Sequence, residues 1–224
     1  MVIGDDVVAC TVPAVITIVV RVWMPDRPGA LGQVASRIGA VRGDVLSIEI
    51  LEQGAGRAID ELTVELPDAD LMPLLTAEID AVDGVSVESI RLVDPDRTDA
   101  SLSALAVGAA IAESPAAERL EVMIQGVRRF AETDWVVVIS DGEAVTQVGS
   151  PPDLGWLEAF LAGSGHLDGL DDSAPSDLLW GHMGTSALTV AAGRRDNPIH
   201  ERERVRFSLL LRLADALVSA HPVA

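Results

Sequence analysis

The chain has 224 residues, of which 49% are hydrophobic, so it has ample apolar material for a buried core. Its formal net charge of −19 argues against an extended nucleic-acid interface, because phosphates must be neutralised by a basic surface. All 16 basic residues are arginine, which excludes lysine chemistry such as Schiff bases and pyridoxal phosphate attachment.

The N-terminal segment 7–20 is apolar, but two threonines and a proline interrupt it, and Asp5 and Asp6 precede it. A signal peptide requires a positively charged start, and a membrane helix requires about 20 apolar residues, so neither is expected. Cys10 is the single cysteine, which excludes an intrachain disulfide and a cysteine zinc cluster. These features favour a soluble protein of the reducing cytoplasm.

Residues 14–93 show six successive patterns, in the order strand, helix, strand, strand, helix, strand. Gly54 and Gly56 separate the two central strands, which are predicted to form a hairpin. Asp68 or Asp70 is the expected N-cap of the second helix. The βαββαβ order predicts the split βαβ, or ferredoxin-like, arrangement. The expected elements are strand 14–23, helix 31–41, strands 43–53 and 58–66, helix 68–82 and strand 85–93.

The turn Asp-Arg-Pro-Gly, residues 26–29, connects the first strand to the first helix. Pro28 suits the first turn of a helix, and Asp26 is expected to cap that turn. Gly29 lets a ligand approach the backbone without meeting a Cβ atom. Free amides at this helix end would favour a small anion, such as the carboxylate of a free amino acid. These amides belong to Ala30, Leu31 and Gly32.

The ammonium group of such an amino acid would need a nearby acceptor, for which Asp26 and Asp44 are both candidates. The alternative interpretation needs no ligand. In it, Asp26 only caps the helix, and Asp44 is a solvated turn residue.

The stretch "DRPGALGQVASRIGAVRGDVLSIEIL" resembles the core of an ACT domain, and the similarity extends over residues 14–93. The resemblance implies a ferredoxin-like domain that pairs with a second copy and binds an amino acid at the interface. It also implies a ligand loop at 24–31 and a facing strand at 44–46. The ligand-binding residues expected from it are Met24, Asp26, Arg27, Pro28, Gly29, Ala30, Leu31, Asp44, Val45 and Leu46.

From Asp94 onward the sequence becomes polar and then alanine-rich, so we expect a linker over residues 95–115 with at most a short helix. A second unit is predicted for residues 116–224, with a hairpin that turns through Asp141 and Gly142. Its expected elements are helix 116–132, strands 134–141 and 142–150, helix 152–163, strands 176–184 and 185–195, and helix 199–220.

The second unit faintly resembles a GAF-like sensor domain, chiefly through its arginine- and leucine-rich closing helix. In that helix we expect a stripe at a spacing of four to pack into its own domain; the alternative is pairing with a partner's helix. The stripe consists of Val205, Leu209, Leu213 and Leu217. His166 and His182 lack the spacing of a zinc motif, so neither a metal nor a cofactor is expected.

The sequence thus predicts an α+β protein with an ACT-like domain at 1–94, a linker at 95–115 and a GAF-like domain with an antiparallel sheet at 116–224. We expect a cytoplasmic, non-catalytic regulatory protein that senses an amino acid as a homodimer, without nucleic-acid or membrane partners. A separate regulatory protein is a candidate for the output, because no output signature follows. The alternative is a structural dimerisation protein without a ligand.

Overall fold

The structure, a computed structural model, describes residues 15–97, 99–163 and 175–219. The chain divides into two compact units, Met1–Arg97 and Thr98–Ala224. Each unit contains one four-stranded sheet, and all the strand pairs in both sheets are antiparallel. The predicted α+β class is therefore confirmed. Within the described residues, no helix is long and apolar enough to cross a membrane.

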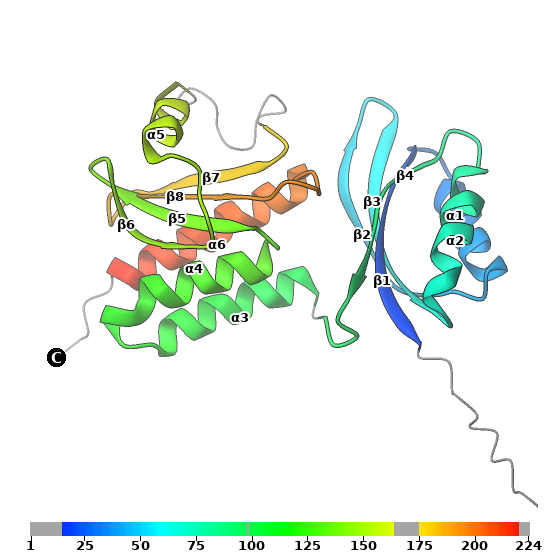
Figure 1. The fold of residues 1–224 in the computed structure, drawn as a ribbon, viewed down its shortest axis with the longest axis horizontal. Coiled ribbons are helices and arrows are strands. Elements are labelled where there is room, and N and C mark those ends of the chain that lie inside the picture. Colours follow the sequence, from blue (N-terminus) through cyan, green and yellow to red (C-terminus); the bar gives the residue numbers. More distant parts are fainter. Residues whose placement is uncertain (1–14, 98, 164–174, 220–224) are drawn as a thin grey trace, which may run out of the picture. The chain divides into compact units, whose positions relative to one another are not determined.

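The first unit has the predicted βαββαβ order, with a short 3-10 turn before its second helix. Its sheet has the strand order β2-β3-β1-β4, and Figure 1 shows both helices on one face of that sheet. Asp68 accepts a hydrogen bond from the Asp70 amide at 3.0 Å and so caps the 3-10 turn, whereas α2 itself begins after Leu71 without a side-chain cap. The elements are β1 (Ile16–Pro25), α1 (Ala30–Ala40), β2 (Asp44–Gly54), β3 (Arg57–Leu66), the 3-10 turn Ala69–Leu71, α2 (Met72–Asp80) and β4 (Ser86–Val93).

The core of the first unit lies between the sheet and its two helices. Alternate residues of β1 and β3 point to this side, as the period of two in a strand requires. The helices contribute residues at spacings of three and four. The core includes Ile18, Val20 and Val22 of β1, Leu62, Val64 and Leu66 of β3, Val34 and Ile38 of α1, and Leu75 and Ile79 of α2.

Strand β2 lies at one edge of this sheet and exposes apolar side chains. Leu46, Ile48 and Ile50 are 50%, 43% and 41% exposed. Two irregularities in its pairing with β3, between Val45 and Ser47 and between Ile50 and Glu52, interrupt the simple alternation of faces. An apolar edge strand with unpaired backbone groups is a surface on which another strand can pair.

The second unit places its helices on both faces of a sheet with the strand order β6-β5-β8-β7. Asp141 and Gly142 both have positive φ angles, 47° and 82°, in the predicted turn between β5 and β6. The elements are α3 (Ala100–Glu113), the 3-10 turn Ala116–Glu118, α4 (Arg119–Phe130), β5 (Trp135–Ser140), β6 (Glu143–Val148), α5 (Leu154–Gly163), β7 (Leu178–Met183), β8 (Leu188–Gly193) and α6 (Glu201–Ser219).

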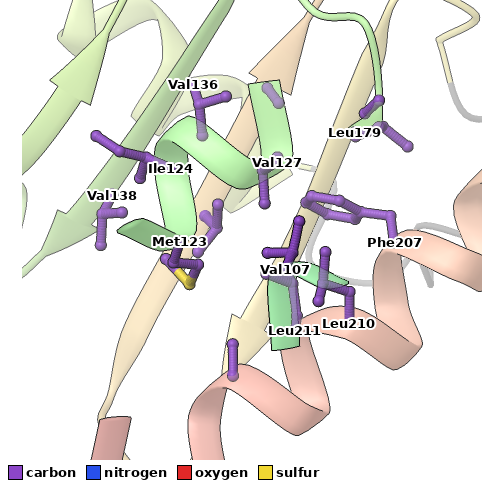
Figure 2. Close-up of a cluster of buried hydrophobic side chains, with 14 of the residues drawn as sticks. Val107, Met123, Ile124, Val127, Val136, Val138, Leu179, Phe207, Leu210 and Leu211 are labelled. Atoms are coloured by element: carbon purple, nitrogen blue, oxygen red, sulfur yellow. The ribbon is translucent and has the colours of Figure 1, made fainter. Parts of the chain in front are cut away.

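Both faces of this second sheet are covered by apolar clusters. On one face, side chains of α3, α4 and α6 meet the inward residues of the strands, as Figure 2 shows for Val107, Ile124, Val138 and Phe207. On the other face, α5 covers Trp135 and a set of neighbours that includes Val137, Ile139 and Trp180. The strand β5 is therefore apolar at every position from 135 to 139, because it is buried on both sides. The GAF-like assignment of this unit stays a prediction.

The segment predicted as a linker, 95–115, contains the 14-residue helix α3. Asp99 caps this helix by accepting hydrogen bonds from the amides of Ser101 and Leu102. Val107 and Ile111 lie in the core of the second unit, so α3 is an integral part of that unit. Alanine-rich composition concealed the helix, because its small residues give little apolar periodicity.

The predicted packing of the α6 stripe is wrong for three of its four residues, and only Leu217 packs against the core. Val205, Leu209 and Leu213 are 39%, 55% and 41% exposed. The buried face instead carries Phe207, Leu210, Leu211 and Ala214, together with Arg204 and Asp215. One turn of an α-helix contains 3.6 residues. Residues at strict steps of four therefore move progressively around the helix and do not stay on one face.

Candidate functional site

The turn before α1 is closed by backbone hydrogen bonds. The Asp26 amide donates to the Gly56 carbonyl at 3.0 Å, and the Arg27 amide donates to the Pro25 carbonyl at 2.9 Å. Gly29 has φ 87°, in the left-handed region that other L residues adopt only with strain. A Cβ atom at Gly29 would meet nothing within 4 Å, so the space above this residue is open.

The start of α1 has no side-chain cap. Gly29 is its N-cap, so the prediction that Asp26 caps the helix is wrong. The Ala30 amide donates to the Arg27 carbonyl at 3.2 Å and is not free, contrary to expectation. The first α-helical bond runs from the Gln33 amide to the Gly29 carbonyl at 3.1 Å. The amides of the two intervening residues, Leu31 and Gly32, precede that bond and lie at the positive end of the helix dipole.

Within one copy of the chain, the structure separates the predicted ligand loop from the predicted facing strand. Pro25 and Gly54 both pair with Arg57, so the loop lies beside the end of β2. Asp44 pairs with Glu65 at the opposite end of the sheet. At about 3.3 Å per residue, the two ends of β2 are about 30 Å apart. Asp44, Val45 and Leu46 therefore lie far from the turn of their own copy.

The residues of the predicted loop differ in their accessibility. Residues 26–29 are exposed and Leu31 is half-buried, whereas Ala30 and Met24 are each only 2% exposed and belong to the core. The side chain of Met24 therefore packs against the core. Arg27 donates to Gln33 Oε1 at 3.3 Å and lines an open groove of about 680 Å³ beside α1. Arg37 and Asp83 are other charged residues along that groove.

Sequence reasoning missed Asp60, a carboxylate on β3 that is only 4% exposed. Its neighbours in register are Val22 on β1 and Ile50 on β2, and the flanking inward residues Ala58 and Leu62 belong to the core under the helices. Burial, and then the negative charge of Asp26 in the turn, raise the pKa of Asp60. The available signal was a carboxylate on the face of the strand that is otherwise apolar.

The adjacent residue, Glu61, points to the other face of the sheet and is paired. Its Oε2 lies 2.8 Å from Arg21 Nε, and its Oε1 lies 3.0 Å from Arg97 Nη2. Burial acts to raise the pKa of Glu61, but the nearby guanidinium groups of Arg21, Arg97 and Arg91 outweigh it and lower the pKa. Glu61 is thus paired with guanidinium groups on the face of the sheet opposite the helices.

The structure gives no support for a metal centre in the part of the chain that it describes, where no three potential ligand side chains gather. His182 Nδ1 lies 2.9 Å from the Thr189 hydroxyl, across the β7–β8 pair. His166, the other histidine considered above, lies outside the described residues.

Comparison with known proteins gives a family match to residues 18–84, which fit the model of the ACT domain. No curated protein matches the chain significantly. Among solved structures, an uncharacterized protein from Thermotoga maritima is 20% identical, with 36% of this chain and 99% of that chain covered and a TM-score of 0.29.

Two further solved structures are similar at the same level. The ACT domain of GTP pyrophosphokinase from Chlorobium tepidum is 16% identical, with 35% of this chain and 99% of that chain covered and a TM-score of 0.29. An unknown protein from Galdieria sulphuraria is 14% identical, with 91% of each chain covered and a TM-score of 0.33. The family match covers the open glycine turn, the start of α1 and the edge strand β2, and residues 18–84 of this chain are an ACT domain.

Proposed function

We propose that this protein is a regulatory protein without catalytic machinery, whose ACT domain binds a free amino acid between two copies of the chain. ACT domains typically bind amino acids in regulatory proteins. The observation that carries the proposal for this chain is the start of α1. There, the N-cap is a glycine with φ 87° and open space around its Cα atom, and no side chain caps the backbone amides of the first helical turn.

Two of these amides suit the carboxylate of an amino acid. The N–H groups of Leu31 and Gly32 and the positive end of the helix dipole both favour an anion. Residues 26–29 are exposed, so a small molecule can reach them. The chain has no lysine, so no ammonium side chain is present that would favour a larger polyanion over a single carboxylate.

The position of Asp44 favours a site that two copies share. An antiparallel pairing of the β2 edges of two copies would bring the Asp44 end of one copy beside the Gly54 end of the other, where the ligand loop lies. Such a pairing would bury part of the apolar surface that Leu46, Ile48 and Ile50 now expose to water. Asp44, Val45 and Leu46 would then complete the site of the second copy.

A ligand held between two copies provides a mechanism of regulation. Its binding energy favours the arrangement of the two copies that completes the site, by as much as its affinities for the two arrangements differ. We propose that the second unit, predicted to be GAF-like, reports this change to a partner regulatory protein.

The second candidate function is a structural dimerisation protein without a ligand. It is favoured by the same apolar edge of β2, which would pair two copies without any molecule at the turn. The two candidates differ in whether the start of α1 binds a small molecule.

A thermal-unfolding screen against the twenty amino acids tests the proposal. We expect one amino acid or a small group to raise the melting temperature with increasing concentration. At a hundredfold excess over Kd, the free energy of unfolding should rise by about 2.7 kcal/mol. Gly29→Val should abolish the shift, because its side chain fills the open space. Gly142→Val, at φ 82° in the β5–β6 turn, is the matched control for backbone strain and should keep the shift.

The shared site is tested by Ile48→Glu, which places a charge on the edge of β2. We expect this variant to sediment as a monomer and to lose the ligand-induced shift together with dimerisation. A dimer that responds to no amino acid would favour the scaffold candidate. Chemical conversion of the bound amino acid, detected by mass spectrometry, would contradict the absence of catalysis.

A further inference from the structure

Helix α3 forms an outer layer of the second unit. It packs on α4 and α6, which in turn contact strands of the sheet, and Figure 1 shows α3 farther from that sheet than α4. The buried residues of α3 are Val107, Gly108 and Ile111, which lie on one side of the helix.

The outward side of α3 is nevertheless apolar. Leu102 and Leu105 are 58% and 64% exposed. The exposed positions that follow are three alanines and the last residue, Glu113, which is the single charged residue of this helix. A helix that is apolar around its whole circumference is normally buried on every side. The outward side of α3 therefore has the composition of a contact surface.

This apolar surface continues onto α6. Leu213 packs so closely against Gly108 of α3 that a Cβ atom on the glycine would clash with it. Val205 and Leu209, on the same helix as Leu213, are 39% and 55% exposed. An exposed apolar surface that extends over two helices is typical of an interaction site. We call the five exposed residues Leu102, Leu105, Val205, Leu209 and Leu213 the helical face.

Arginines flank the helical face on two sides. A groove of about 320 Å³ lies between α3 and α4, and its walls are apolar apart from Ser103 and Arg129. Arg212 follows Leu209 by three positions and so lies beside it on α6. Both arginines are exposed, and neither forms an ion pair with another described residue. Two exposed cations thus border an apolar surface in a chain of net charge −19.

We propose that the helical face and the adjoining groove bind an amphipathic helix of the partner regulatory protein, with carboxylates beside its apolar stripe. The inference rests on the function proposed above, in which the second unit reports to such a partner, and it specifies the surface and its chemistry. Apolar side chains of the partner at i, i+3, i+4 and i+7 pack against Leu102, Leu105 and Leu209. Its flanking carboxylates pair with Arg129 and Arg212.

Charge favours this occupant over a second copy of the chain. A second copy would present its own Arg129 and Arg212 at the edges of the same surface. A two-fold contact between two helical faces would therefore bring like charges together, which opposes association.

Fluorescence anisotropy on the full chain tests the surface with three labelled helical peptides of about 18 residues, or about five turns. The first has leucines at i, i+3, i+4 and i+7 with glutamates on both flanks. The second has lysine in place of each glutamate, and the third has the composition of the first with its leucines distributed around the helix. We expect the first peptide to bind at least about tenfold more tightly than either of the others.

Substitutions locate the binding on the helical face. Leu105→Glu should weaken binding of the acidic peptide at least about tenfold, because it places a like charge in an apolar contact. Arg129→Gln together with Arg212→Gln should weaken it about fivefold and reduce its dependence on salt. Leu74→Glu changes a leucine on α2 that is 49% exposed, so it is the matched control and should leave the affinity unchanged. Leu209→Glu is a second test if Leu105→Glu alters the near-ultraviolet circular dichroism of the folded protein.

The outcomes separate this inference from the proposed function. Failure of the acidic peptide to bind, equal affinity for the acidic and basic peptides, or an equal loss in Leu74→Glu overturns the inference. A change from dimer to monomer in the sedimentation of Leu105→Glu assigns the helical face to a second copy and also overturns it. These results leave amino-acid sensing intact, because the thermal shift is measured without a peptide. If no amino acid gives a shift while the acidic peptide binds the helical face, sensing is overturned and the docking surface stands.

Discussion

Two consecutive carboxylates of β3 show how strongly the environment of a single residue decides its role. Asp60 and Glu61 are 4% and 6% exposed, and they point to opposite faces of the same sheet. Glu61 meets the guanidinium groups of Arg21 and Arg97, whereas the Oδ1 atom of Asp60 meets no hydrogen-bond donor in the described part of the chain. The pKa of Glu61 is lowered and that of Asp60 is raised.

The raised pKa of Asp60 predicts that this residue destabilises the folded protein. The folded state binds its proton more tightly than the unfolded state, so stability is expected to fall as the pH rises from 3.8 through the folded pKa. Asp60→Asn should remove this dependence and raise the free energy of unfolding at neutral pH by about 1 kcal/mol. Urea unfolding between pH 4 and pH 8 measures both effects, and a destabilised variant with an unchanged pH profile would contradict them.

Asp215 is the opposite case, a carboxylate that stabilises the second unit. It accepts hydrogen bonds from the Thr185 amide at 2.9 Å, the Ser186 amide at 3.0 Å and the Ser186 hydroxyl at 2.8 Å. These bonds, that from Thr185 foremost, lower the pKa of Asp215 from 3.8 to about 2. They attach the β7–β8 turn to α6.

We therefore expect Asp215→Ala to lower the free energy of unfolding by about 1.5–3 kcal/mol at neutral pH, since charge-assisted hydrogen bonds are lost. The contribution of Asp215 is fully present above pH 3.8 and is lost as the pH falls toward 2. The difference between wild type and variant should shrink over that acid range in urea unfolding. A difference that is constant down to pH 2 would show that the carboxylate charge is not responsible.

At the scale of the elements, α6 shows the limits of an apolar pattern. Leu209 is 55% exposed, whereas its neighbour Leu210 is 3% exposed and packs in the core. The sequence alone offers two overlapping leucine patterns on this helix. Only the packing of α3, α4 and the sheet against α6 selects the buried one.

The two adjacent leucines provide a matched pair of substitutions. Leu210→Ala should lower the free energy of unfolding by about 2–5 kcal/mol, because it leaves a cavity in the core. Leu209→Ala should change it by less than about 0.5 kcal/mol, as is usual at the surface. Urea unfolding at a common pH compares them. Equal effects of the two substitutions would contradict the assigned face of α6.

At the scale of the whole molecule, the chain consists of two units with separate cores. The second unit begins before α3, about 18 residues earlier than the sequence predicts, since Thr98 rather than residue 116 marks its start. Val107 and Ile111 of α3 are 9% and 0% exposed, and the core of the unit includes both.

The boundary predicts how two fragments behave. A fragment of residues 98–224 should unfold cooperatively in urea and give a near-ultraviolet circular dichroism signal from its buried tryptophans. A fragment of residues 116–224 lacks α3 and should lose that signal, because Val107 and Ile111 no longer fill the core. Identical unfolding midpoints for both fragments would contradict the role of α3.

Apart from α3, the sequence by itself determined the order and type of the main elements, including the Asp141–Gly142 hairpin and the ferredoxin-like first unit. It succeeded because strand alternation, helical spacing and turn glycines are local properties of a few neighbouring residues. It also identified the turn at Gly29, because glycine adopts the positive φ angle of this position without strain.

The tertiary structure alone decided which residues share a site and which face of a helix is buried. Asp44 and the ligand loop lie at opposite ends of one sheet, whereas Asp60, distant in the sequence from Val22, pairs with it in the core. Strand pairing and helix packing set these relations, and both join residues that are far apart along the chain. Periodicity contains no information about such distances, because each pattern records only which side of its own element is apolar.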